Sequence, residues 1–253
     1  MKQTAIRFAG ILCLLLATST PILAQILRVQ GRHVPPENMG EVISRETTYW
    51  AEVARKAIQD GHMTGWRMYR QIDGMDLDDA PNIFFVNEFT PEQMNQGEDV
   101  WDHTKVFPDK EYSEIETFSL GTTKSLVFYY RLVGIGKPDP KIIRVNFAKT
   151  PGMEAIQRYL ELEQSVWQPF VQERMDSGKT NVVGWSLLRM LAPVGRDVEW
   201  DAISVDGFDN LVDALLPYYG DDRPFPDNEE IWEVHHKAVI HFYELIMAVG
   251  PEE

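Results

Sequence analysis

A glutamate followed four residues later by a tryptophan occurs twice in the chain, as Glu46-x-x-x-Trp50 and as Glu163-x-x-x-Trp167. At 100° per residue, apolar side chains of the same helical stripe surround Glu46, and a similar stripe runs beside Glu163. A carboxylate in such a place must be paired, hydrogen-bonded or protonated, because an isolated charge is costly to bury. A raised pKa would let either glutamate act as a base or anchor a ligand, so both are candidate catalytic residues.

The second interpretation of these glutamates is structural. Arginines that also recur in the two halves could pair with them, namely Arg28 and Arg144 or Arg70 and Arg189. Such an ion pair would hold a helix against a sheet and would also perturb the carboxyl pKa. Because duplicated catalytic sites commonly decay in one copy, the presence of the glutamate in both copies favours this structural interpretation.

Four tryptophans are expected where a long helix meets a strand: Trp50, Trp66, Trp167 and Trp185. Large aromatic side chains at repeated positions are typical of a packed core. They would also suit the wall of an apolar pocket between helix and sheet, the kind of space that small molecules use. The predicted ligand-binding set therefore consists of these tryptophans together with Glu46 and Glu163.

The elements that must position these residues form an internal repeat. Gly61 and Gly65-Trp66 recur as Gly178 and Gly184-Trp185, and Tyr130 aligns with Tyr243 near the ends of the two copies. The glycines at 61 and 178 are expected to end the long helices. Period-two and period-3.6 patterns predict the order strand, helix, strand, strand, helix, strand in each copy, which is the ferredoxin-like unit.

The expected strands and long helices have the following ranges. In the first copy they are a strand at 26–32, a helix at 38–59, a strand from 65, and strands at 82–86 and 125–130. In the second copy they are a strand at 141–148, a helix at 152–176, a strand from 184, and strands at 201–205 and 238–243, the last of which could also be helical. A turn-rich segment, Gly136–Pro140, separates a first unit at 25–136 from a second at 137–253.

The first 24 residues have the three parts of a secretory signal. Lys2 and Arg7 precede a short apolar run, and small or aliphatic residues precede an expected cut after Ala24. We therefore expect a signal peptide at 1–24 and a periplasmic or secreted protein. Cys13 is the only cysteine, so the mature chain would hold no disulfide and no thiolate. No other segment is apolar for long enough to span a membrane.

The formal net charge is −15, and it becomes −17 when Lys2 and Arg7 are removed with the leader. Such an acidic chain repels phosphate backbones and anionic lipids, so nucleic-acid and membrane-surface partners are disfavoured. The acidic run from Asp73 to Asp79 misses the spacing of a calcium loop, and motifs of zinc proteases, phosphate-binding loops and hydrolase elbows are absent. No metal site is predicted.

The order of elements, the long helix with Glu-x-x-x-Trp and the Gly-Trp opening of the second strand resemble the dimeric α+β barrel superfamily. Among its members, exported bacterial proteins of uncharacterised activity are the most similar. The resemblance extends over about 26–133 and 141–247. It implies an α+β fold in which two tandem ferredoxin-like βαββαβ units form one barrel within the chain, and thus a monomer.

The superfamily includes monooxygenases without a cofactor, haem-degrading enzymes and proteins without known activity, so this fold does not imply one function. Haem-degrading members use an asparagine, a tryptophan and a histidine. The corresponding candidates in this chain are Asn146, Trp200 and either His235 or His236. Their spacing is not diagnostic, so no cofactor is predicted, and haem remains the one cofactor that the resemblance raises.

Three functions are left open. The leading one is an exported barrel protein that binds a small apolar molecule or a partner in a helix–sheet pocket. The first alternative is a haem-binding or cofactor-free monooxygenase, and the second is a purely structural periplasmic protein. The residues do not form a recognisable catalytic set, so an enzyme is not predicted outright.

Overall fold

The computed structural model describes residues 25–251 apart from 75–79, 97–99, 195–198, 221–225, 227–229, 231–232 and 234–236. The predicted leader at 1–24 and two of the candidate haem residues, His235 and His236, lie outside the described residues.

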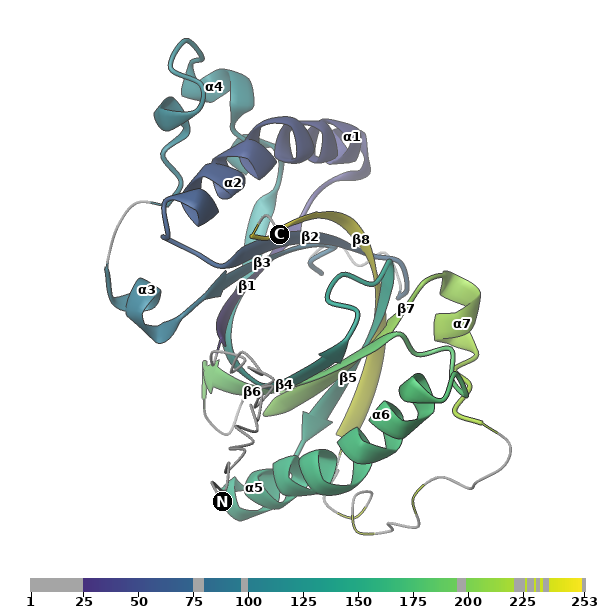
Figure 1. Ribbon diagram of the computed structural model, residues 1–253. Coiled ribbons are helices and arrows are strands. Elements are labelled where there is room, and N and C mark those ends of the chain that lie inside the picture. The colour runs from purple at the N-terminus through teal and green to yellow at the C-terminus, as the bar shows by residue number, and fades with distance from the viewer. Residues whose placement is uncertain are drawn as a thin grey trace, which may run out of the picture.

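Eight strands pair into one closed barrel in the order β1-β3-β2-β8-β5-β7-β6-β4 (Figure 1). Their bounds are β1 (Gln25–His33), β2 (Gly65–Gln71), β3 (Ile83–Phe89), β4 (Thr122–Gly136), β5 (Ile142–Lys149), β6 (Gly184–Ala192), β7 (Ala202–Phe208) and β8 (Lys237–Val249). Each strand is antiparallel to both neighbours, and closure leaves none of the eight with an open edge. The α+β class expected from the sequence is confirmed, and the segment that could have been helical, 238–243, belongs to β8.

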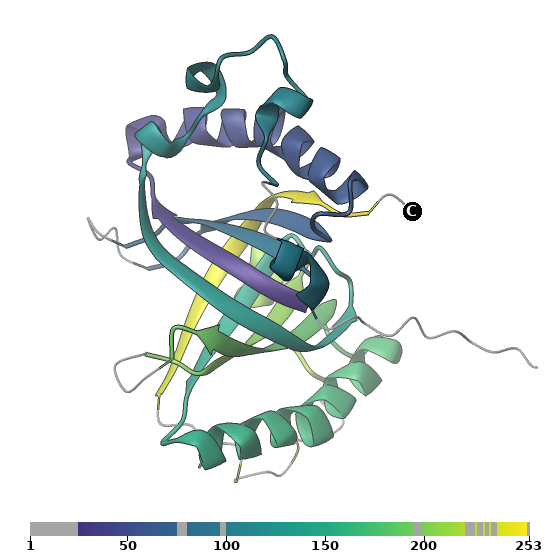
Figure 2. The same ribbon diagram turned by 90° about the vertical axis from the view of Figure 1, so that its left-hand side faces the viewer.

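Two long helical rods cover opposite sides of the barrel (Figures 1 and 2). The first rod joins α1 (Pro36–Arg45), η1 (Glu46–Trp50) and α2 (Ala51–Gln59), and the second joins α5 (Met153–Leu162), η4 (Glu163–Trp167) and α6 (Gln168–Asp176). Gly61 and Gly178 follow the rods with φ of 79° and 66°, the left-handed conformation that ends helices. Shorter helices are α3 (Pro91–Gln96), η2 (His103–Lys105), α4 (Tyr112–Ile115), η3 (Phe118–Leu120) and α7 (Leu211–Leu215).

The middle of each rod is a π-helical turn, and these turns coincide with the two Glu-x-x-x-Trp motifs. In the first, the Ala51 N–H donates to the Glu46 carbonyl, and in the second the Gln168 N–H donates to the Glu163 carbonyl. A π turn adds one residue to a helical turn and shifts the faces of the residues that follow. A regular 3.6-residue period, which the sequence suggested, therefore does not run unbroken through either rod.

Both faces of the barrel wall are apolar. On β2, Trp66 and Met68 pack in the core beneath the first rod, whereas the alternate residue Tyr69 packs in a separate cluster inside the barrel. This alternation is the ordinary consequence of the two-residue period of a strand. The molecule thus has a core under each rod and a third cluster in the barrel interior.

The strand register corrects one correspondence drawn from the sequence. Ile26 pairs with Tyr130 in β1–β4, and the matching residue Ile142 pairs with Glu244 in β5–β8. The residue that corresponds to Tyr243 is therefore Tyr129 and not Tyr130. The error matters because a slip of one residue moves a side chain to the other face of a strand.

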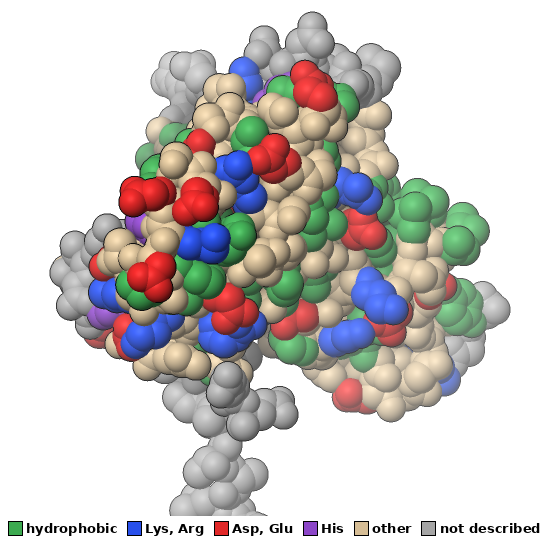
Figure 3. All heavy atoms as spheres, turned by 90° about the horizontal axis from the view of Figure 1, so that it is seen from above, with side chains coloured by type: hydrophobic (Ala, Val, Ile, Leu, Met, Phe, Trp, Pro, Cys, Tyr) green, Lys and Arg blue, Asp and Glu red, His purple; other side chains and the backbone are tan. Residues whose placement is uncertain are grey.

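The outer surface of the first rod, over α1 and α2, carries acidic and basic side chains next to one another (Figure 3). Several form ion pairs along the first rod: Glu41 with Arg45, Glu52 with Arg55, and Lys56 with Asp60. In the part of the chain that the structure describes, no helix combines the length and the apolar character needed to cross a membrane.

Candidate functional site

The barrel encloses a cavity of about 610 Å³. Every strand of the barrel contributes to its wall, mostly through alternate residues that point inward. The aliphatic and aromatic part of the wall includes Leu27, Val29, Tyr69, Phe84, Val86, Val127, Tyr129, Ile143, Val145, Phe147, Leu188, Trp200, Ile203, Val205, Val239 and Tyr243. This volume lies within the usual range of small-molecule sites, which are concave and mostly apolar.

The predicted pocket between helix and sheet is not where this cavity lies. Of the six residues predicted to bind a ligand, only Trp185 is among those that line it. Trp66 and Trp185 are almost fully buried on the helix-facing side of β2 and β6, and the Trp66 ring stacks on Phe85 with centroids 6.2 Å apart. The Trp50 indole N–H donates to the Ile115 carbonyl at 2.9 Å, and Trp167 packs on Phe170. For Trp66 the physical reason is alternation, because its side chain packs under the first rod and the next residue of the strand, Arg67, is the one that lines the cavity.

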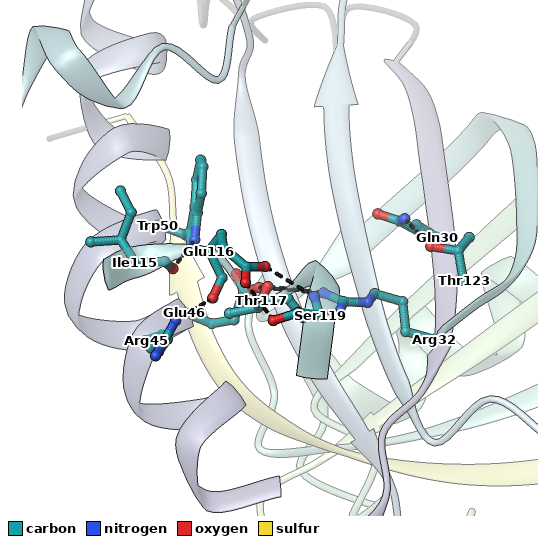
Figure 4. Close-up of polar contacts among 10 residues, drawn as sticks. All are labelled: Gln30, Arg32, Arg45, Glu46, Trp50, Ile115, Glu116, Thr117, Ser119 and Thr123. Atoms are coloured by element: carbon teal, nitrogen blue, oxygen red, sulfur yellow. Dashed lines mark hydrogen bonds and ion pairs between the residues drawn. The ribbon is translucent and has the colours of Figure 1, made fainter. Parts of the chain in front are cut away.

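Glu46 is buried in a polar cluster between the first rod and the barrel wall (Figure 4). The Thr117 hydroxyl donates to its carboxylate at 2.5 Å, and an Arg32 nitrogen lies 3.7 Å from the same oxygen. Burial raises the pKa of Glu46 to about 7, against the opposing effects of Thr117 and Arg32. The partner expected from the repeat was Arg28 or Arg70, so the ion-pair residue was misassigned. Arg28 lies over the Phe89 ring, and Arg70 pairs with Glu244 instead.

Arg32 could not be chosen from the repeat because the matching residue of the second half, Ala148, has no charge. The pairing of Arg32 with Ile83 and of Ala148 with Ala202 places the two at equivalent positions. Glu163 accordingly has different surroundings. It is hydrogen-bonded to Tyr159, and its Oε2 has no partner among the described residues. Burial, with the negative charge of Asp206 adding to it, raises the pKa of Glu163 to about 8.

A histidine and an aspartate meet at the wall of the cavity. His241 of β8 lines it, and the His241 Nδ1 lies 3.1 Å from the Asp73 Oδ2. The other oxygen of Asp73 accepts the Phe242 backbone N–H at 3.0 Å, which holds the carboxylate beside the strand. With Nδ1–H directed at a carboxylate, the Nε2 of a neutral imidazole is left as an acceptor. This pair is the arrangement in the cavity best suited to accept a proton.

The acidic run that includes Asp73 was considered from the sequence as a calcium loop, whose spacing it misses, and its residues 75–79 lie outside the described part of the chain. His241 was not singled out at all. Its signal was the alternation of Val239, His241 and Tyr243 along the last strand, which was obscured while that segment could still be helical.

Three tyrosines line the cavity: Tyr69, Tyr129 and Tyr243. The Trp200 indole N–H donates to the Tyr129 hydroxyl at 2.8 Å. Burial raises the pKa of Tyr69 to about 12 and also raises the pKa values of Tyr129 and Tyr243. All three hydroxyls therefore keep their protons at neutral pH.

Charged residues lie along one part of the cavity wall. The Glu88 carboxylate accepts a hydrogen bond from Arg131 at 2.5 Å and forms an ion pair with Arg67 at 2.8 Å. Arg67 also pairs with Asp139 of the segment between the two halves. Burial alone would raise the pKa of Glu88, but the positive charges of Arg67 and Arg131 outweigh it and hold the pKa below its usual value.

The Glu88, Arg67 and Arg131 side chains of this cluster belong to the first half of the chain and have no charged counterparts at two of the equivalent positions in the second half. The register places Ser186 where the first half has Arg67, and Gly207 where it has Glu88. The missing side chain of Gly207 leaves room for the connecting segment, because a Cβ there would lie 2.6 Å from Pro140. The two halves thus contribute different polar groups to one cavity.

Two of the candidate haem residues, Asn146 and Trp200, lie within the described residues. Asn146 donates its amide to Asp206 at 3.0 Å and is not among the residues that line the cavity, whereas Trp200 does line it. The histidines predicted beside them are not described. Among described residues, no group of three or more His, Cys, Asp and Glu side chains could hold a metal ion.

No family model matches the chain, and no curated protein matches its sequence. Its fold is similar to that of a protein of Lactobacillus acidophilus NCFM provisionally described as a monooxygenase, with a TM-score of 0.57 and 10% identity over 90% of this chain and 96% of that one. A similarly described protein of Fusobacterium nucleatum has a TM-score of 0.55 at 11% identity, over 90% of this chain and 95% of its own.

An anthrone oxidase-like protein has a TM-score of 0.50 at 13% identity, over 91% of this chain and 94% of that one. At such low identity the likeness concerns the fold alone. The chain shares the α+β barrel fold of these proteins.

Proposed function

We propose that this chain is an exported protein that binds one small apolar molecule inside its barrel. The observation that carries the proposal is the cavity of about 610 Å³, whose wall is aliphatic and aromatic with a few polar groups. Pockets of this volume and composition are typical of small-molecule sites. The ligand site of this proposal lies inside the barrel, on the other side of the wall from the helix–sheet space expected from the sequence.

Export rests on the leader-like segment at 1–24, in which Lys2 and Arg7 precede a short apolar run and an expected cut after Ala24. The periplasmic or secreted address, cleavage after Ala24 and the absence of a disulfide belong to the same proposal. The mass of the protein recovered from the periplasm of a producing bacterium tests it, since cleavage leaves a chain of residues 25–253.

A tandem origin is the second part of the proposal. The strand order β4-β1-β3-β2 in the first half and β8-β5-β7-β6 in the second supports two ferredoxin-like units divided near residue 136. Because the two halves close the barrel by themselves, a monomer is expected. Native mass spectrometry measures that state directly.

The same measurement tests ligand binding with a matched pair of variants. Val127 lines the cavity, whereas its neighbour Leu126 lies on the outer face and is 49% exposed. Val127→Trp should fill part of the cavity and abolish retention of the bound molecule, and Leu126→Trp should leave retention unchanged. If the wild type carries no small molecule and takes up none, the structural alternative gains and the binding proposal fails.

A monooxygenase is the second candidate, favoured by the His241–Asp73 pair at the cavity wall. Similarity in fold to proteins described as monooxygenases is in keeping with it. His241 would take a proton from the bound molecule, and Asp73 would orient the imidazole. His241→Gln should then abolish oxygen uptake with the retained molecule while leaving its binding intact. Haemin added in the same experiment distinguishes a haem-binding monooxygenase from one without a cofactor, since stoichiometric binding of haem would favour the haem-binding enzyme.

A further inference from the structure

The hydroxyl groups of Tyr69, Tyr129 and Tyr243 have unused hydrogen-bonding capacity. Their side chains are 8%, 3% and 6% exposed, and all three line the cavity. Within the described part of the chain, the hydroxyls of Tyr69 and Tyr243 have no hydrogen-bond partner. The Tyr129 hydroxyl accepts from Trp200 and donates to no described residue. Among the residues that the structure describes, three O–H donors thus find no acceptor inside one largely apolar cavity.

The three donors reach the cavity from different parts of its wall. Tyr129 is on β4 and Tyr243 is on β8, which are separated by three strands on either side of the closed barrel. Tyr69 is on β2, next to β8. The Tyr243 ring is held against Phe84 with centroids 5.1 Å apart, and Trp200 holds the hydroxyl end of Tyr129. Packing thus holds two of the three donors in place.

Buried donors that remain unpaired when a ligand fills the cavity carry a desolvation penalty. A hydrocarbon ligand would leave all three hydroxyls in that state. A ligand with acceptor oxygens would satisfy them, because each carbonyl oxygen offers two lone pairs. The tyrosines are neutral. Of the cations that line the cavity, Arg67 and Arg131 are paired with Glu88 and Asp139, and Lys137 is paired with Asp209, so the described wall has little positive charge left for an anionic ligand.

We infer that the ligand is a neutral, largely apolar molecule with one or more carbonyl oxygens, and that Tyr69, Tyr129 and Tyr243 select it by donating hydrogen bonds to those oxygens. The inference rests on the proposed function, since it concerns the same cavity. The tyrosines are specificity-determining residues, and Trp200 is a positioning residue that orients the Tyr129 hydroxyl.

The test uses fluorenone and fluorene, two tricyclic molecules of similar shape that differ by a carbonyl in place of a methylene group. Affinities for residues 25–253 are measured by quenching of tryptophan fluorescence. The readout is the ratio of the fluorene Kd to the fluorenone Kd, which cancels the contribution of shape. Tyr69→Phe and Tyr243→Phe are the most informative variants, because neither removes a hydrogen bond from the described structure. Tyr129→Phe completes the set, and Tyr130→Phe, on the outer face of β4, is the control.

We expect the ratio to fall on the order of tenfold in at least one of the three variants, the size expected for one hydrogen bond. It should stay at the wild-type value in Tyr130→Phe. The carbonyl stretching band of bound fluorenone should shift to lower frequency in the wild type and move back in the same variant. Melting curves exclude a general loss of fold.

Two contrary results have different meanings. If both probes bind and the ratio is the same in the wild type and all three variants, the carbonyl inference is overturned and the proposed cavity site stands. If neither probe binds up to its solubility limit, the proposed function is contradicted, and the inference fails with it.

Discussion

The carboxylate of Glu46 lies 3.7 Å from the guanidinium of Arg32, and the Thr117 hydroxyl donates to the same carboxylate oxygen at 2.5 Å. Arg32 comes from β1, Glu46 from the π-helical turn of the first rod, and Thr117 from the segment that precedes β4. One buried cluster thus connects three separate parts of the first half of the chain. It lies outside the cavity, so its predicted effects concern stability.

Glu46→Gln should flatten the dependence of stability on pH between about 4.5 and 7. The folded-state pKa of about 7 exceeds the ordinary value of 4.5, so the folded protein keeps a proton that the unfolded chain has already released. The free energy of unfolding of the wild type therefore falls as pH rises through this range, by up to about 1.4 kcal/mol per pH unit from this group. Urea unfolding at several pH values measures it, with Glu37→Gln of the same rod as the exposed control. Parallel curves for the wild type and Glu46→Gln would contradict the prediction.

Glu88→Gln should change the dependence of stability on pH in the opposite direction. The folded-state pKa of Glu88 lies below its ordinary value, so its contribution is present above about pH 4.5 and is lost as pH falls through the folded-state pKa. Because the variant leaves Arg67 and Arg131 buried without their shared carboxylate, it should lose about 3–5 kcal/mol at pH 7. Its stability should also fall less steeply in acid than that of the wild type. A variant as stable as the wild type at pH 7 would mean that the cluster contributes no net stability.

Trp66→Ala should cost about 3–5 kcal/mol, the usual penalty for removing a large core side chain. Ligand binding is measured in the milder variant Trp66→Phe, which should retain the fold. Trp66 is on the helix-facing side of β2. The affinity of the Trp66→Phe protein for the retained molecule should therefore stay within about twofold of the wild-type affinity. A large loss of affinity in a folded Trp66→Phe protein would indicate that the ligand binds in the helix–sheet space and not inside the barrel.

Gly207→Ala should destabilise the connection between the two halves. The new Cβ would lie 2.6 Å from the Pro140 Cγ, closer than such contacts allow. Overpacking of this kind costs about 1–3 kcal/mol. Gly40→Ala is the matched control, because nothing lies within 4 Å of its Cβ and it stands within α1. It should raise stability by about 0.5–1 kcal/mol. Thermal unfolding of both variants checks the expected loss and the expected gain of stability. If Gly207→Ala is as stable as the wild type, the segment that contains Pro140 can move away from residue 207 without a cost in free energy.

Local patterns in the sequence were sufficient to predict most of the helices and strands of the fold. Gly61 and Gly178 ended the helices as predicted, since a residue with positive φ is the local requirement there. Alternating apolar residues indicated the strands, and their order with the helices predicted ferredoxin-like units. The barrel was implied by the resemblance to a known superfamily. The π-helical turns at Glu46 and Glu163 were not predicted, because the apolar residues of both helices were interpreted with a regular 3.6-residue period.

The location of the cavity was not determined by the sequence. Tyr69 and Trp66 are both apolar enough for a core. The two-residue period of a strand places them on opposite faces of β2, but it does not decide which face is turned to the barrel interior. That choice is made when β2 pairs with β8 and β4 with β6, because closure turns one face of every strand inward. The contacts of Asp73 with His241 and of Asp139 with Arg67 follow from the same closure. The sequence by itself therefore determined the elements and their order, which are local properties. Only the tertiary structure decided which side chains share the cavity, since it brings together residues that are far apart in the chain.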